Sequence, residues 1–374
     1  MVMQNFNLEK NTPVKLLVLG CGGFIGSHFL ERIINDQSWK ITGIDTHSAK
    51  ISHLLSAENF TFFQSDIQDT ELLKNCIASS DIVISLAALC NPAQYTTIPV
   101  DVIESNFTIP LKTVELCSKH KKRLVHFSTS EVYGKTLANF LPQNSPQKED
   151  PYYYLLNEDT TPLLMGPVRS QRWCYASAKQ LLERAIFAHS FEYGLPYTIV
   201  RPFNFIGPRM DYIPGIDGSG TPRVIACFMN ALLSSTSLRL VNGGKNRRVF
   251  TYIDDAIDAL IAIIKRPENS QNQIFNIGNP ANEISISELA TRMIEIYTDI
   301  NPVSRPVKYG LQNVSAEEFY GCGYDDSDRR VPDISKAEKL LQWRPSIDLD
   351  TALNKTVQWY YQEYNQRKEH IRAG

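Results

Sequence analysis

The chain has 374 residues, of which 43% are hydrophobic and 21% charged, which indicates a globular protein with room for one large α/β unit and a smaller region. Lys and Arg (38) nearly balance Asp and Glu (40), which leaves a formal net charge of −2. This balance predicts no surface for a polyanion, so nucleic acid is not an expected partner, and a few placed arginines must hold any anionic ligand.

The first 204 residues alternate short apolar strands with helical patterns. After a polar tail at residues 1–13, KLLVLG (15–20) predicts a strand, and the apolar spacing from Phe24 onward predicts a helix packed on it. Further strands are predicted at 39–45, 60–66, 81–88, 123–130 and 197–204, and helices at 71–78, 99–119 and 170–193. This alternation predicts right-handed βαβ units in a doubly wound parallel sheet, an α/β fold of the Rossmann type.

The remaining segments predict a smaller mixed α/β lobe. Residues 135–169, rich in Pro and Tyr, predict a long loop over the cleft, and Gly/Pro-rich stretches follow Asn204. Helices are predicted near 223–235, 254–265 and 286–298. We expect a cofactor-binding domain at 14–204, with 240–276 returning to it, and a substrate-binding lobe made of 205–236 and 277–365.

The cysteines and the apolar runs indicate the compartment. The seven cysteines show no CxxC pair and no histidine at metal-ligand spacing, so we expect reduced thiols and no metal. The longest apolar run, residues 82–90, is too short to span a bilayer, and the polar N-terminal sequence has no signal core. A soluble, cytoplasmic protein without a membrane partner is the expectation.

A glycine-rich turn joins the first predicted strand to the first helix. Gly20, Gly23 and Gly26 have the GxxGxxG spacing that lets a backbone approach a pyrophosphate at a helix N-terminus. Asp45 ends the second strand, where a carboxylate accepts both ribose hydroxyls of NAD and repels the 2′-phosphate of NADP; the alternative is a turn or capping residue. The predicted cofactor is therefore NAD, with further contacts from Phe24, Ile25, Asp66, Ile67 and Ala87.

A tyrosine and a lysine predict the chemical centre. Tyr175 and Lys179 lie four residues apart, on one face of the helix predicted at 170–193, so the ammonium favours a phenolate that acts as a base. Thr129, Ser130 and Glu131 follow the fifth strand, at the edge where ligands of open α/β sheets bind. The alternatives are a solvated helix face for the first pair and a capping or surface charge for Glu131.

These motifs resemble extended short-chain dehydrogenases that act on nucleotide sugars. The chain carries Thr-Ser-Glu at 129–131, as decarboxylases of UDP-glucuronate do, where the related dehydratases carry Thr-Asp-Glu. It is most similar to the UDP-apiose/UDP-xylose synthase family in NPAQYTTIPVD (91–101), RPFNFIGPRMDYIPGIDG (201–218) and FYGCGYDDSDRRVPD (319–333).

The resemblance implies a sequence of chemical steps. Hydride passes from C4 of UDP-glucuronate to NAD⁺ while Tyr175 removes the hydroxyl proton. The 4-keto group lies β to the carboxylate, so carbon dioxide leaves, and the enolate is protonated near Glu131 and Ser130, with Arg330 beside the carboxylate. Reduction of the 4-keto pentose gives UDP-xylose, whereas retro-aldol cleavage and re-closure before reduction give UDP-apiose.

Two positions bear on the product. The synthases have a cysteine at the position of Cys90, whose thiol the resemblance assigns to proton transfers in ring contraction; the alternative is a small buried hydrophobe. The plant synthases have a second cysteine where this chain has Ser130. That departure favours simple decarboxylation over apiose formation.

Cationic and polar side chains are needed for the substrate. The resemblance assigns Arg248 to the diphosphate and adds sugar, carbonyl and further anion contacts, because guanidinium groups match phosphate and carboxylate oxygens. These further candidates are Tyr95, Arg172, Asn204, Arg209, Arg223, Tyr252 and Arg330. Any one arginine could instead be a surface charge, and the acidic loop 324–328 a solvated turn.

Three other functions remain open at this point. The chain could be a decarboxylase that yields only UDP-xylose or the 4-keto pentose. It could catalyse 4-epimerisation or dehydration, or be an inactive NAD-binding sensor, although the latter usually loses the Tyr–Lys pair. By fold-level analogy we expect a homodimer that pairs through the helices predicted at 99–119 and 170–193.

Overall fold

The computed structural model describes residues 12–212, 221–301, 309–321 and 324–373, with side chains described as far as residue 367. The polar tail predicted at residues 1–13 therefore lies almost wholly outside the described residues. None of the helices in these ranges is long and apolar enough to cross a membrane.

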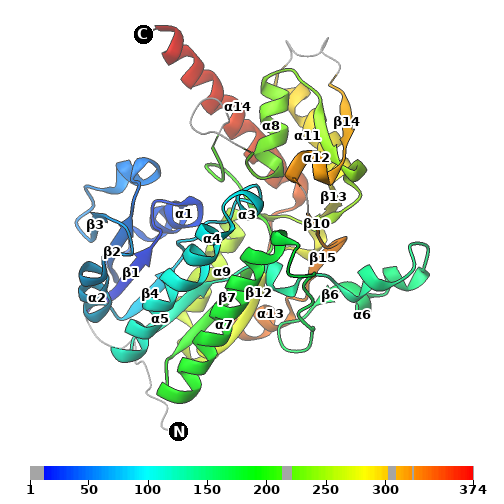
Figure 1. Cartoon of the computed structure of the whole chain (residues 1–374). Helices are drawn as coiled ribbons and strands as arrows, with labels where there is room; N and C mark the ends of the chain where they lie inside the picture. Colours follow the sequence, from blue (N-terminus) through cyan, green and yellow to red (C-terminus); the bar gives the residue numbers. More distant parts are fainter. Residues whose placement is uncertain (1–11, 213–220, 302–308, 322–323, 374) are drawn as a thin grey trace.

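A seven-stranded parallel sheet forms the centre of the larger of two lobes (Figure 1). Its order is β12-β7-β5-β4-β1-β2-β3, the doubly wound order in which the chain moves outward from β1 in both directions. The strands are β1 (Val14–Leu19), β2 (Trp39–Asp45), β3 (Phe60–Gln64), β4 (Ile82–Ser85), β5 (Arg123–Phe127), β7 (Tyr197–Pro202) and β12 (Gln273–Ile277). The predicted fold class is confirmed. The central strands are buried on both faces, which explains their continuous apolar runs.

Helices cover both faces of this sheet and define two cores. One face carries α1 (Phe24–Ile33) and α9 (Ile253–Lys265), which pack on each other. The other carries α2 (Thr70–Ser79), α5 (Ile109–Lys119) and α7 (Cys174–Tyr193). The helix predicted at 99–119 is one continuous run, in which the π-helical segment η2 (Glu104–Thr108) separates α4 (Pro99–Ile103) from α5.

The strand predicted at 81–88 ends early, at Ser85. Its neighbour β1 ends at Leu19, and the next residue, Gly20, turns the chain away with φ +85°. A Cβ on Gly20 would lie 2.7 Å from the backbone nitrogen of Ala87. The backbone at Gly20 is therefore in close contact with Ala87 where the two strands end, and the residues after Ser85 line a cavity.

The second lobe contains three small sheets beside the large one. A four-stranded sheet has the order β13-β10-β15-β6, and parallel pairs join β14 to β9 and β11 to β8. The strands are β6 (Leu155–Leu156), β8 (Phe205–Ile206), β9 (Leu238–Val241), β10 (Arg247–Val249), β11 (Thr251–Tyr252), β13 (Glu283–Ser285), β14 (Leu311–Val314) and β15 (Arg329–Pro332). The lobe boundaries predicted from the sequence remain a prediction.

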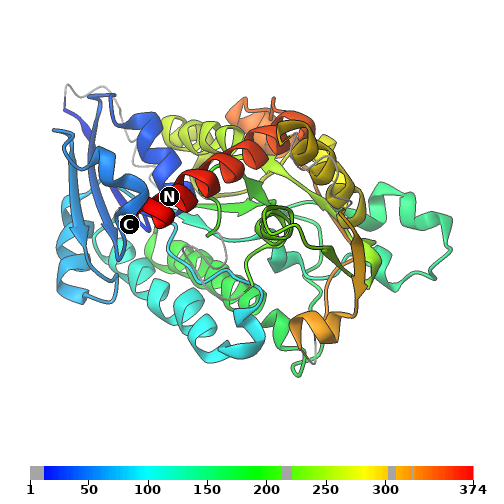
Figure 2. The ribbon, with the colours of Figure 1, turned by 90° about the horizontal axis from the view of Figure 1, so that it is seen from above.

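Helices complete this lobe. They are α8 (Val224–Leu233), α11 (Ile286–Ile300), α12 (Ala316–Tyr320) and α14 (Leu349–Ala373). Helix α14 packs on α11 and α8, and the view from above shows it running across the top of the molecule (Figure 2).

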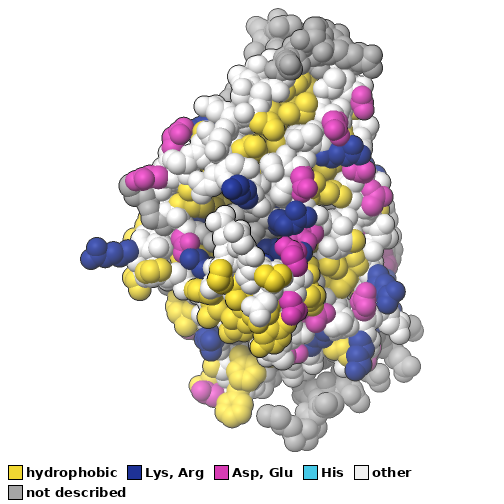
Figure 3. All heavy atoms as spheres, turned by 90° about the vertical axis from the view of Figure 1, so that its right-hand side faces the viewer, with side chains coloured by type: hydrophobic (Ala, Val, Ile, Leu, Met, Phe, Trp, Pro, Cys, Tyr) yellow, Lys and Arg dark blue, Asp and Glu magenta, His cyan; other side chains and the backbone are white. Residues whose placement is uncertain are grey.

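The segment predicted as a loop at 135–169 is more ordered than expected. It contains β6, which pairs with β15, and the short helix α6 (Pro151–Tyr154), which extends away from the body in Figure 1. The ring centroid of Tyr154 lies 3.5 Å from the guanidinium carbon of Arg329. This contact packs the residue before β6 against the first residue of β15. Figure 3 shows this side of the molecule, where acidic and basic side chains alternate around an exposed hydrophobic area. Phe140 and Tyr152, both well exposed, belong to the same segment.

Candidate active site

A cavity of about 580 Å³ lies at the carboxyl ends of β1 to β4. It is lined by six of the residues predicted for the cofactor, namely Gly20, Gly23, Asp45, Asp66, Ile67 and Ala87. The carboxyl ends of parallel strands are where open α/β sheets bind nucleotides. Phe24 and Ile25 form the first turn of α1 and do not line this cavity.

The glycine turn fits a pyrophosphate. Helix α1 begins after Gly23 without a side-chain cap, so the first N–H groups of the helix are free of such a partner. A Cβ on Gly26 would lie 2.5 Å from the carbonyl oxygen of Gly20, so only glycine lets the helix approach the strand this closely.

Asp45 lies at the end of β2, in the lining of the same cavity. Its two carboxylate oxygens accept hydrogen bonds from the backbone N–H groups of Gly22 (2.8 Å) and His47 (2.9 Å). These bonds fix the carboxylate at the end of β2 and leave it lining the cavity. The residues present therefore fit NAD: glycines and a helix N-terminus for its pyrophosphate, and a carboxylate for its ribose.

Tyr175 and Lys179 lie in the first turns of α7, both nearly inaccessible to solvent. The Lys179 ammonium donates a hydrogen bond to the carbonyl oxygen of Phe127 (3.1 Å). Burial lowers the pKa of Lys179 to about 8. Burial raises the pKa of Tyr175 well above its usual range, while a hydrogen bond with Thr129 acts in the opposite direction. The surrounding protein therefore keeps the phenol neutral, and additional positive charge must arrive for Tyr175 to become a base.

Tyr95 packs against the phenol and does not line the arginine-lined pocket described below. Its ring stacks on the ring of Tyr175, with centroids 4.9 Å apart and planes 10° from parallel. The guanidinium carbon of Arg172 lies over the Tyr95 ring, 5.1 Å from its centroid. Tyr95 is only 1% exposed, so it orients its neighbours by packing.

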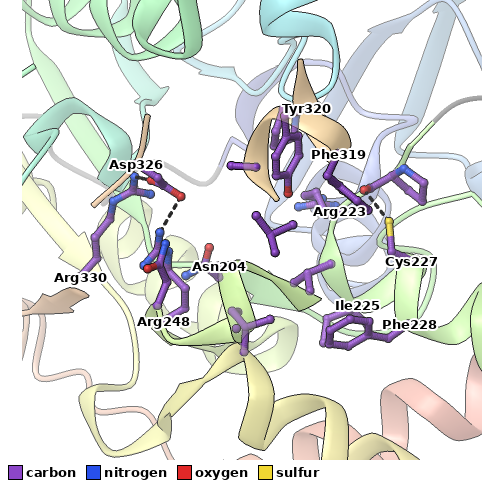
Figure 4. Close-up of a pocket in the computed structure, with 18 of the residues that line it drawn as sticks. Asn204, Arg223, Ile225, Cys227, Phe228, Arg248, Phe319, Tyr320, Asp326 and Arg330 are labelled. Carbon is purple, nitrogen blue, oxygen red and sulfur yellow. Dashed lines mark hydrogen bonds and ion pairs between the residues drawn. The ribbon is translucent and has the colours of Figure 1, made fainter. Parts of the chain in front are cut away.

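Next to these rings, three arginines surround two carboxylates. Arg172 makes a bidentate ion pair with Glu131 (2.5 and 2.8 Å), and Arg330 lies 3.8 Å from the same carboxylate. Asp326 binds Arg248 at 2.7 Å, contacts Arg330, and lies 3.9 Å from Arg172 (Figure 4). Burial opposes ionisation of both carboxyls, but the arginines lower the pKa of each. Both carboxylates are therefore charged.

This cluster has an excess of one positive charge. The Nε atoms of Arg172 and Arg330 are buried without a hydrogen-bond partner among the described residues. A buried donor without an acceptor is costly unless a ligand or water supplies one. The cluster is therefore suited to receive an anionic group.

The cluster forms one end of a pocket of about 370 Å³ between the sheet and the second lobe. Seven of the predicted chemical and substrate residues line it: Cys90, Glu131, Arg172, Asn204, Arg223, Arg248 and Arg330. The far end has an apolar and aromatic wall (Figure 4), which includes Ile225, Phe228, Phe319 and Tyr320. Thr129, Ser130, Tyr175 and Lys179 lie outside its lining, at the sheet edge behind Cys90 and Glu131.

The structure does not bring Arg209 and Tyr252 into this pocket. Arg209 makes a bidentate ion pair with Glu31 on α1 (2.6 and 2.7 Å), so its charge is already neutralised away from the pocket. Tyr252 is buried in the core at the end of β11, with the ammonium of Lys355 5.0 Å from its ring. Both assignments rested on motif matches that give no side-chain direction.

Sequence reasoning missed Asp326 as a member of the cluster. An acidic run in a polar loop is usually solvated, and only its position four residues before Arg330 could have suggested the contact. Among the described residues no group of three or more His, Cys, Asp or Glu side chains is arranged to hold a metal ion.

This fold and site define a nucleotide-dependent enzyme class, and the chain belongs to the NAD dependent epimerase/dehydratase family, which it matches over residues 16–278. Within it the chain is 44% identical over 360 residues to UDP-D-apiose/UDP-D-xylose synthase 1 of Arabidopsis thaliana, covering 94% of this chain and 92% of that one. It is also 44% identical to the UDP-D-apiose/UDP-D-xylose synthase of Oryza sativa subsp. japonica, over 95% of this chain and 91% of that one. The predicted family and the predicted NAD cofactor are confirmed.

A solved structure agrees with this family. The PbgP3 protein from Burkholderia pseudomallei superimposes with a TM-score of 0.80 at 32% identity, over 95% of this chain and 98% of that one. The similarity therefore extends over both the sheet and the second lobe.

Proposed function

We propose that the protein is an NAD-dependent enzyme that decarboxylates UDP-glucuronate through a UDP-4-keto pentose to UDP-apiose, UDP-xylose or both. The relatives named UDP-D-apiose/UDP-D-xylose synthase support this reaction. The observation that carries the proposal is the arginine cluster with its excess positive charge, in a pocket beside Tyr175. UDP-glucuronate brings a diphosphate and a carboxylate, which need such cations.

The first step is oxidation at C4 of the sugar. Bound NAD supplies the hydride acceptor here and the hydride donor at the end of the cycle, and its positive charge favours the phenolate of Tyr175. Tyr175 removes the C4 hydroxyl proton, and the hydrogen bond between Thr129 and Tyr175 orients the phenol. Lys179, held on the Phe127 carbonyl, contributes a second positive charge when protonated.

Decarboxylation follows from the position of the new ketone. The C6 carboxylate is β to it, so carbon dioxide leaves while the C5–C6 bonding electrons move into the enolate. Arg172 fixes Glu131 by an ion pair, and Arg330 lies beside the same carboxylate. Arg330 is therefore placed to orient the leaving carboxylate of the substrate. A proton then returns to C5, and reduction of the ketone completes UDP-xylose.

The nucleotide end of the substrate fits the opposite side of the pocket. Arg248, on the Asp326 side of the cluster, and Arg223, beside the aromatic wall, are the cations we assign to the diphosphate between the two ends. The wall formed by Phe228 and Phe319 is suited to a uracil ring. Asn204 lies between these ends, with its side-chain amide donating to the carbonyl oxygen of Val249 (2.8 Å), which fixes its orientation.

The branch toward UDP-apiose needs retro-aldol cleavage of C2–C3 and re-closure before reduction. Cys90 lines the pocket at the sheet edge, as a residue that transfers protons in this branch must. Ser130 is buried next to Glu131, and a hydroxyl there is a weaker acid than a thiol. A product mixture dominated by UDP-xylose is therefore the second candidate outcome, favoured by Ser130.

Carbon dioxide release tests this function. Purified protein with NAD⁺ and UDP-glucuronate labelled with ¹³C at C6 should release labelled carbon dioxide in proportion to substrate consumed. Tyr175→Phe should bind NAD normally and lose about a thousandfold in rate, the middle of the range for a lost general base. Conversion to an epimer or a dehydrated sugar without carbon dioxide would contradict the proposal.

We also propose a homodimer through α4 and α7. Helix α4 exposes Val100 (65%) and Ile103 (42%), and α7 exposes Phe187 (59%) and Phe191 (73%). The two helices pack beside each other in one chain, so a second copy would complete a four-helix bundle over these side chains. Light scattering should give twice the chain mass, and Phe187→Glu with Phe191→Glu should give the monomer.

A further inference from the structure

Residues 208–211 form a short connection between the cofactor side of the molecule and the substrate pocket, called here the 208–211 strap. Both of its ends are fixed by side chains rather than by secondary structure. On the pocket side it holds Arg223, and on the cofactor side it is held by α1 and by η1 (Ala49–Leu54), the helical turn after β2.

On the pocket side, the strap determines how Arg223 is oriented. The Nη2 atom of Arg223 donates to the carbonyl oxygen of Met210 (2.6 Å), and its Nε donates to the carboxylate of Asp211 (3.0 Å). The backbone N–H of Arg223 donates to the same Asp211 oxygen (3.1 Å). Two atoms of one guanidinium are thus fixed by two adjacent strap residues, and the side chain lines the pocket.

On the cofactor side, the strap is held by three polar contacts. Glu31 of α1 binds the guanidinium of Arg209 through both carboxylate oxygens, at 2.6 and 2.7 Å. Lys50 donates to the carbonyl oxygen of Arg209 (2.7 Å), and the His28 ring nitrogen lies 2.9 Å from the carbonyl oxygen of Pro208. Arg209 has φ +64°, a conformation that residues with a Cβ seldom adopt unless contacts hold them there.

We propose that Glu31, through Arg209, is a positioning residue for Arg223 and so for the diphosphate of the substrate. The proposal rests on the proposed function in one respect, that Arg223 contacts an anionic nucleotide. Helix α1 carries the glycine turn at its N-terminus, so the same helix would place the cofactor pyrophosphate and, through the strap, the substrate cation. Loss of the ion pair should weaken substrate binding while cofactor binding is retained.

UDP alone is a suitable probe, because its binding does not require catalysis. Isothermal titration of NAD-saturated protein with UDP should give a dissociation constant about three- to fivefold higher for Glu31→Gln than for wild type, the range expected for a partly exposed ion pair. Arg209→Met should reproduce this loss, and Arg209→Lys should recover part of it. The affinity for NAD and the melting temperature should change little.

A double-mutant cycle separates a positioning role from a general structural one. Arg223→Met should weaken UDP binding, and Glu31→Gln added to it should cause no further loss, because the group that Glu31 positions is gone. Asp258→Asn is the matched control, since it removes the pair that Arg32, the neighbour of Glu31 on α1, makes at 2.5 Å with α9. This control should leave UDP binding unchanged.

Equal losses from Glu31→Gln with and without Arg223→Met would mean that Glu31 acts by another route. An unchanged UDP affinity in Glu31→Gln and Arg209→Met would exclude the role altogether. A wild-type protein that binds UDP but releases no carbon dioxide from UDP-glucuronate would contradict the proposed function and leave this cycle valid.

Discussion

The ring of Tyr95 lies parallel to the ring of Tyr175, with centroids 4.9 Å apart, so Tyr95 packs against one face of the phenol. Tyr175 is 6% exposed and Tyr95 is 1% exposed, which makes the pair a packed unit rather than two independent substrate contacts. Arg172 lies within 5.8 Å of the rings of Tyr95 and Tyr324, so the same support extends to the arginine cluster. Rigid packing of this kind reduces the reorganisation needed when the base acts.

Tyr95 can be tested by a pair of substitutions. Tyr95→Phe keeps the stacked ring and should retain most of the activity. Tyr95→Leu removes the stack and leaves a gap, which should lower the free energy of unfolding by about 3 kcal/mol and kcat by about tenfold. Denaturant titration and steady-state rates measure the two effects. Equal rates for the Leu and Phe variants would exclude the orienting role.

Asp326 should contribute to stability through the arginines it holds. Asp326→Asn removes the counter-charge of Arg248 and Arg330 and should lower the free energy of unfolding by about 3 kcal/mol. Asp325→Asn is the control, because the Asp325 side chain is 25% exposed and pairs only with Lys135 among the ion pairs described. A smaller loss for Asp326→Asn than for Asp325→Asn would contradict the cluster.

The same carboxyl gives a pH dependence with a defined sign. The arginines hold the folded pKa of Asp326 below its usual value, so its contribution is present above about pH 4 and is lost as the pH falls further. Wild-type protein should therefore lose stability on acidification more steeply than Asp326→Asn. Parallel curves for the two proteins would mean that Asp326 does not change its pKa on folding.

Lys179 gives a pH dependence of the same sign in a more alkaline range, because its folded pKa is also lowered. Its folded pKa of about 8 lies below the unfolded value near 10.4, so between these values the unfolded chain binds one more proton than the folded chain. The free energy of unfolding should then rise with pH by about 1.4 kcal/mol per unit in this window, relative to Lys179→Met. Urea titrations of both proteins from pH 7.5 to about 10 measure the difference. Equal slopes for the two proteins would exclude a lowered pKa for Lys179 in the folded state.

Gly26→Ala tests the packing of the glycine turn. Its methyl group would lie 2.5 Å from the Gly20 carbonyl oxygen and 2.6 Å from the Cα of Cys21, so α1 must move away from β1. The dissociation constant for NAD should rise at least about tenfold. Gly23→Ala, whose nearest contact would be 3.2 Å, should have a milder effect. Fluorescence titration with NAD measures both dissociation constants. A larger increase for Gly23→Ala than for Gly26→Ala would contradict the close packing of α1 on β1 at Gly26.

The sequence was most informative where chemistry depends on local spacing. The sheet strands, the glycine turn and the Tyr175–Lys179 pair follow from periodicity and from positions relative to strand ends. The large sheet was predicted almost completely because its central strands are apolar on both faces. The strand predicted at 81–88 is longer than β4 because residues 86–89 are as apolar as the strand itself. The neighbouring strand β1 ends at this level, where the backbone turns at Gly20.

Contacts between segments distant in sequence could not be predicted in this way. Asp326 reaches Arg248 across 78 positions and Arg209 reaches Glu31 across 178, and no local pattern carries that information. The cationic residues around the pocket were named from motif matches, which identify a position but not the direction of its side chain. Arg209 therefore received a substrate role although its partner is on α1.

The most direct test is an NMR time course of wild-type protein with NAD⁺ and uniformly ¹³C-labelled UDP-glucuronate. We expect loss of the C6 carboxylate signal, an equal amount of labelled carbon dioxide and bicarbonate, and five-carbon UDP-sugar products, with UDP-xylose alone or mixed with UDP-apiose. A folded, NAD-bound protein that leaves the carboxylate signal intact, or that only inverts C4, would contradict it.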